Sequence, residues 1–124
     1  MTNSEKLLWS LWERLELLRQ MDSDGHIECY VCGQKVNYTQ VSLRVVYNRT
    51  LPFSFVAENN YFCCDDCKRP GIYRNIWKKK NNELGYDLRQ KIVLHQPVVY
   101  DEDEIQQAIR KLSRILKNHD YERQ

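Results

Sequence analysis

The sequence predicts an α+β fold in which a small zinc-binding module of short strands is flanked by an amphipathic helix on either side. Three observations support this prediction: cysteines in two clusters, a β-branched and aromatic stretch between them, and apolar residues at helical spacing near both chain ends. With 124 residues, 42% of them hydrophobic, the chain suits one domain better than two. We expect a helix in residues 1–25, the zinc module in 26–82, and strands plus a second helix in 83–124, packed together.

The first helix is predicted by leucines and tryptophans that recur at three- and four-residue steps from about Ser4 to Met21. Asn3 or Ser4 can cap its first amide groups, and the polar turn at residues 22–25 ends it. Its apolar face either covers the core of the domain or docks on a partner protein or a second copy of the chain. The candidate docking residues are Leu8, Trp9, Leu11, Trp12 and Leu15.

Two later stretches favour strands. The segment from Val36 to Val56 is rich in β-branched and aromatic residues with polar interruptions, which predicts two or three short strands. Further on, Pro97 divides the apolar runs at 91–94 and 98–100. Because proline cannot donate to a sheet ladder, we expect one broken strand or two short ones at a sheet edge.

A short basic helix is predicted between Ile72 and the break at Asn81-Asn82. The net charge of +2 does not by itself indicate a nucleic-acid-binding protein. However, residues 68–80 contain no acid, so this helix either contacts phosphates or presents an ordinary solvated face. The candidate phosphate-binding residues are Lys68, Arg69, Arg74, Lys78, Lys79 and Lys80.

The last helix is predicted from Ile105 onward, where apolar residues again recur at helical steps as far as Leu116. Four acidic residues at 101–104 precede it, and basic residues gather towards its other end. This charge order suits the helix dipole.

The cysteine spacing predicts one structural zinc ion. Cys29 and Cys32 form a Cys-x-x-Cys pair, and Gly33 after them supplies the positive φ that such a knuckle turn often needs. Cys67 completes a second pair with either Cys63 or Cys64, because both spacings are chemically workable. Four thiolates saturate the ion, and the knuckle, strands and basic helix together predict a treble-clef-like finger.

Enzymatic activity is not expected. His26-Ile27-Glu28 followed by Cys64-x-x-Cys67 loosely imitates the signature of zinc deaminases, but the proline before the cysteine is missing and the knuckle is left unexplained. A fully thiolate-ligated zinc also has no open position for an activated water.

The cysteine usage and the N-terminal segment both favour an intracellular, reducing compartment. The odd number of cysteines in Cys-x-x-Cys spacing favours metal binding over disulfides. The first residues lack a basic segment leading into an apolar run, so we expect no signal peptide, and no stretch is apolar enough for a membrane span.

Two family resemblances extend these predictions. Tyr61-Phe62-Cys63 with Cys67 is similar to the signature of the FCS or MYM-type zinc fingers, which implies Cys63 and Cys67 as ligands, with Cys64 in place of the family's serine. Residues 26–117 resemble the poxvirus late transcription factor two family, also called the late gene trans-activators. The matching stretches are the knuckle at 29–32, the residues 61–63, and the segment 91–100 that leads into the last helix.

The second resemblance implies a viral late transcription factor that acts beside the viral RNA polymerase, in the virus factory of the host cytoplasm. It leaves open whether the factor touches nucleic acid or only proteins. The alternative function is a zinc-stabilised adaptor for protein–protein interaction that is not tied to transcription.

Overall fold

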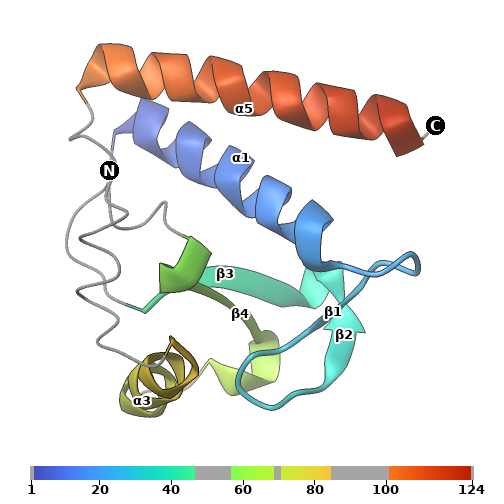
Figure 1. The fold of residues 1–124 in the computed structure, drawn as a ribbon, viewed down its shortest axis with the longest axis vertical. Coiled ribbons are helices and arrows are strands. Elements are labelled where there is room, and N and C mark those ends of the chain that lie inside the picture. The colour runs from blue at the N-terminus through green and yellow to red at the C-terminus, as the bar shows by residue number, and fades with distance from the viewer. Residues whose placement is uncertain (1, 47–56, 69–70, 85–100, 124) are drawn as a thin grey trace. The chain divides into compact units, whose positions relative to one another are not determined.

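The computed structural model describes residues 2–46, 57–68, 71–84 and 101–123, and its fold is α+β (Figure 1). These residues form three α-helices and two small antiparallel sheets of two strands each. The chain divides into two compact units. We call residues 1–20 with 100–124 the helical unit, and residues 21–99 the cysteine unit.

The helical unit consists of α1 (Asn3–Gln20) and α5 (Glu102–Arg123). The two helices lie side by side and start at the same end, so they run parallel (Figure 1). Ser4 Oγ donates to Glu102 Oε1 at 2.8 Å, and Gln106 Nε2 donates to Ser4 Oγ at 3.1 Å. The buried apolar side chains of this unit are Leu8, Leu15, Ile105 and Leu116.

Both helices are capped by the residue that precedes them. Thr2 Oγ1 accepts from the backbone N–H of Glu5 at 3.1 Å, so the cap of α1 is Thr2 and not the predicted Asn3 or Ser4. Asp101 Oδ1 accepts from the N–H of Glu104 at 2.8 Å and caps α5. Acidic residues in the first turn of each helix further stabilise the positive ends of the two dipoles.

Two short hairpins form the sheets of the cysteine unit. Strand β1 (His26–Glu28) pairs with β2 (Lys35–Asn37), and β3 (Val41–Val45) pairs with β4 (Asn60–Cys64). In this register Val41 lies opposite Cys64, the last residue of β4. The strands predicted after Val36 therefore include β2 and β3, while those predicted in 91–100 lie outside the described residues.

Helix α3 (Tyr73–Leu84) follows the second cysteine cluster at the place of the predicted basic helix. The predicted break at Asn81-Asn82 is wrong, since the helix continues through both residues and Asn81 Nδ2 donates to the carbonyl oxygen of Trp77 one turn earlier at 2.9 Å. One buried cluster of the cysteine unit is rich in cysteine, since four of its seven members are cysteines. These members are Cys29, Val46, Tyr61, Cys63, Cys64, Cys67 and Ile76, and Ile27, Leu43 and Phe62 are buried in the unit as well. In the described part of the chain, no helix combines the length and the hydropathy that crossing a membrane requires.

Candidate metal centre

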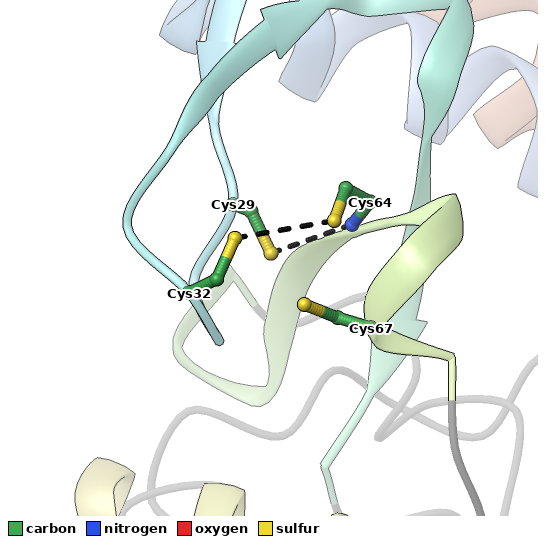
Figure 2. Close-up of side chains that lie close together, drawn as sticks. All are labelled: Cys29, Cys32, Cys64 and Cys67. Atoms are coloured by element: carbon green, nitrogen blue, oxygen red, sulfur yellow. Dashed lines mark hydrogen bonds between the residues drawn. The ribbon is translucent and has the colours of Figure 1, made fainter.

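The first half of the site is the turn between β1 and β2. Gly33 N donates to the carbonyl oxygen of Cys29 at 2.9 Å, and Cys29 N donates to Gln34 O at 2.9 Å. Gly33 has φ of +76°, the left-handed conformation that glycine adopts without strain and that the sequence predicts at this position. This turn directs the thiols of Cys29 and Cys32 to the same side (Figure 2).

The second half comes from the end of β4 and the short 3₁₀ turn η3 (Asp65–Cys67). Cys64 closes the strand in an extended conformation, and Cys67 is the last residue of the turn. Tyr30 N donates to Phe62 O at 2.9 Å, which joins the first turn directly to β4. A backbone hydrogen bond therefore connects the two Cys-x-x-Cys segments.

The four thiols converge on one point. The Sγ atoms of Cys29, Cys32, Cys64 and Cys67 all lie within 4.8 Å of one another, and Cys32 Sγ is 4.0 Å from Cys64 Sγ (Figure 2). In a tetrahedral zinc site with Zn–S bonds of about 2.3 Å, the sulfur atoms lie about 3.8 Å apart. The observed sulfur positions fit such an ion with small adjustments.

The structure favours Cys64 over Cys63 as the third ligand. Successive side chains of a strand point to opposite faces, so these neighbours cannot both face the first turn. Cys64 is in the group of four, and Cys64 N donates to Cys29 Sγ at 3.4 Å. Cys63 is outside that group, and its thiol donates to the carbonyl oxygen of Cys64 at 3.4 Å. The ligand pair implied by the FCS or MYM resemblance, Cys63 with Cys67, is not the pair that the fold brings together.

Backbone amides prepare one of the thiols for ionisation. Burial raises the pKa of Cys29, but amide N–H groups, including those of Cys64 and Val31 at 3.4 Å from its sulfur, lower that pKa to about 7. The pKa of Cys67 is raised by its hydrogen bond to the Cys64 thiol and by burial, and burial also raises the pKa of Cys64. A metal ion that binds here would therefore displace protons from the second pair.

Tyr30, within the first turn, links the site to α3. Lys79 Nζ donates to the carbonyl oxygen of Tyr30 at 2.8 Å and lies 4.0 Å from the centre of its ring, while Lys80 Nζ lies 4.6 Å from that centre. The Tyr30 hydroxyl donates to Glu83 Oε2 at 2.7 Å, and burial together with Glu83 raises its pKa. Sequence reasoning missed Tyr30 and Glu83, because their contact joins residues that are far apart in the chain.

The six candidate phosphate-binding residues differ in whether they contact other residues of the chain. Lys79 and Lys80 lie against Tyr30, and Lys68 Nζ pairs with Asp65 Oδ1 at 3.1 Å. Arg74 and Lys78 are exposed, and Arg69 lies outside the described residues. At least three of the six cations therefore interact with other residues of this chain.

The candidate docking residues of α1 differ in how deeply they are buried. Leu8 and Leu15 are buried within the chain's own fold, so neither presents a free surface to a partner. Trp9, Leu11 and Trp12 are partly buried. The exposed leucine of this helix is Leu7, which is not among the predicted docking residues.

A second group of side chains with metal-binding chemistry consists of Asp22, Asp24 and His26. It lies at the turn before β1 and is largely exposed. Asp22 Oδ1 accepts from the backbone N–H groups of Asp24 at 3.0 Å and His26 at 2.9 Å, which is the geometry of an ordinary turn. His26 therefore belongs to this turn and not to the cysteine group.

Comparison of the chain with protein-family models, with curated proteins and with solved structures found no match.

Proposed function

We propose that this chain binds one structural zinc ion through Cys29, Cys32, Cys64 and Cys67. The observation that carries the proposal is the convergence of four sulfur atoms within 4.8 Å of one another. Thiolate sulfur is a soft ligand, and a tetrahedral set of four is characteristic of zinc or of iron–sulfur centres. The tight turn at Gly33 and the Cys-x-x-Cys spacing of both pairs favour zinc among these.

A structural role follows from the ligand count. Four thiolates leave no coordination position for water or substrate, so the proposed ion joins the first turn to the end of β4 and takes part in no reaction. The order of knuckle, hairpins and a helix after the last ligand supports a treble-clef-like finger. In such a module the free energy of metal binding is largely free energy of folding.

For the whole chain we propose a non-catalytic role in transcription, as a late transcription factor that contacts a viral RNA polymerase. This proposal is supported by the resemblance of residues 26–117 to the poxvirus late transcription factor two family. The contacts of Lys79 and Lys80 with Tyr30 argue against phosphate binding by these two residues of α3, because both already interact within the chain.

An adaptor unrelated to transcription is the second candidate. It is favoured by two exposed apolar side chains in the helical unit, Leu7 at 49% and Ile115 at 37% exposure. Co-purification from infected cells separates the candidates. Recovery of RNA polymerase subunits with the tagged chain supports the transcription role. Recovery of other proteins without any polymerase subunit contradicts that role and supports the adaptor function.

The metal proposal is tested by metal analysis of two neighbouring variants. We expect one zinc per chain in the wild type and in Cys63→Ser, but a loss of zinc in Cys64→Ser, because only Cys64 belongs to the group of four. The two substitutions are chemically identical and adjacent in β4, so each controls for the other. Inductively coupled plasma mass spectrometry gives the zinc content, and native mass spectrometry gives the stoichiometry. A zinc loss confined to Cys63→Ser would instead restore the ligand set of the FCS or MYM signature.

A further inference from the structure

A second basic surface lies on α5, far in sequence from the cysteine site. Four of its cations, Arg110, Lys111, Arg114 and Lys117, are exposed. At 3.6 residues per turn they fall within an arc of about 120° on the helix surface. The centre of this arc is opposite the buried residues Ile105 and Leu116. We call these four side chains the α5 stripe.

The charges of the α5 stripe are not balanced within the helix. Residues three or four positions apart are neighbours on a helix surface, and Arg114 has cations at positions 110, 111 and 117. The acidic residues of the first turn, Glu102 to Glu104, are more than one turn from Arg110. Asp120 is the only acid at such a spacing, next to Lys117.

No compensation comes from the other described residues either. Among the residues whose side chains the structure describes, which end at Asn118 in this helix, none forms an ion pair or a hydrogen bond with the four cations. The negative end of the helix dipole favours cations in the last turn alone, and Arg110 and Lys111 lie well before Arg123. Like charges at these spacings destabilise a helix, so an external anion would relieve a repulsion that the chain itself leaves in place.

The composition of the α5 stripe indicates what kind of anion fits. Gln107 and Asn118 lie in the same arc at the two ends of the stripe, and the exposed apolar side chain of Ile115 lies at its edge, one turn from Lys111. A peptide partner would need a cluster of apolar anchor positions, whereas a phosphate backbone needs only repeated cations. From position 110 to position 117 the helix rises about 10 Å, a length over which duplex DNA carries about six phosphate charges.

We propose that the α5 stripe binds the phosphate backbone of duplex nucleic acid without sequence preference. This inference rests on the proposed role in transcription for its biological setting, and it assigns nucleic-acid contact to α5 instead of α3. It does not depend on the metal, because the stripe belongs to the helical unit.

The test compares two matched double variants of the full, zinc-loaded chain. Arg110→Gln with Arg114→Gln removes two exposed cations four residues apart from α5, and Arg74→Gln with Lys78→Gln does the same in α3. Fluorescence anisotropy with a duplex DNA of about 20 base pairs is measured between 50 and 200 mM salt. We expect the α5 variant to weaken binding about tenfold and to reduce the slope of log K against log salt by about two, and the α3 variant to change both far less.

Circular dichroism and zinc content must be the same in both variants as in the wild type, and glutamine preserves helix propensity. Equal weakening by the two variants, or an unchanged salt slope in the α5 variant, would overturn the proposal. So would competition by poly-glutamate as effective as competition by DNA, because it would indicate an acidic protein partner. If the wild type binds zinc and polymerase but no DNA at 50 mM salt, this inference fails and the proposed function stands. If the wild type binds DNA through the α5 stripe but contains no zinc, the metal proposal fails and this inference stands.

Discussion

The two compact units of this chain differ in what fills their interiors. The buried apolar residues of the helical unit are leucine and isoleucine, placed by the 3.6-residue period of α1 and α5. The buried residues of the cysteine unit include four cysteines, together with apolar side chains such as Ile27, Leu43 and Phe62. One unit is therefore built from aliphatic packing, and the other combines an apolar interior with a cluster of ligand atoms.

This difference has an energetic meaning. A two-stranded hairpin alone is marginally stable in water, and the cysteine unit contains two of them. Its thiols are costly to ionise together when no metal neutralises them, as the raised pKa values of Cys64 and Cys67 indicate. We infer that the cysteine unit needs its ion in order to fold, whereas the helical unit does not.

Removal of zinc gives the largest expected effect. Zinc binding to such sites is worth about 10–16 kcal/mol at neutral pH, so a strong chelator should unfold the cysteine unit. Hydrogen exchange with mass spectrometry should show lost protection in β3 and β4 and smaller changes in α1 and α5. Equal loss of protection in all four elements would show that the units form one cooperative structure.

Truncation of the aliphatic core is expected to come next. Leu8 is 1% exposed, so Leu8→Ala should lower the free energy of unfolding by about 2–5 kcal/mol while the zinc content stays at one per chain. Urea denaturation followed by circular dichroism measures the first quantity, and metal analysis the second.

The neighbouring residue provides the control for that experiment. Leu7 is 49% exposed, and Leu7→Ala should change the free energy of unfolding by less than about 0.5 kcal/mol. A loss of zinc in Leu8→Ala would contradict the independence of the two units, because it would show that the metal site depends on the helical unit.

The smallest effect concerns the contact between α3 and Tyr30. Lys79→Met keeps an unbranched side chain but removes the cation and its hydrogen bond to Tyr30 O, at an expected cost of about 1–2 kcal/mol. Hydrogen exchange of α3 should accelerate while zinc remains bound. Lys78→Met, at an exposed position of the same helix, should leave the exchange unchanged. Similar exchange in both variants would mean that the lysine contact does not hold α3.

Sequence reasoning succeeded where a short-range pattern decides the structure. The three helices follow from the spacing of apolar residues, and the turn at Gly33 follows from the Cys-x-x-Cys-Gly order. The choice between Cys63 and Cys64 could not be made, because every residue of β4 is buried and alternation therefore gives no hydrophobic signal.

Long-range contacts were the other limit. The pairing of α1 with α5 and the contact of Lys79 with Tyr30 join residues that no local pattern connects. Strand β1 has three residues, too few for a period to be recognised, and β4 is hidden in a run of cysteines and aromatics. All of these contacts depend on how distant segments pack against each other, which local sequence patterns do not reveal.

The parallel helices also set an order of events during synthesis. The cysteine unit is one continuous segment, so it can fold as soon as it has left the ribosome, provided that zinc is available. Helix α1 must wait for α5, which is made after the cysteine unit, and until then its leucines lack their final partner. During that interval the nascent chain exposes an apolar helix that a chaperone could recognise.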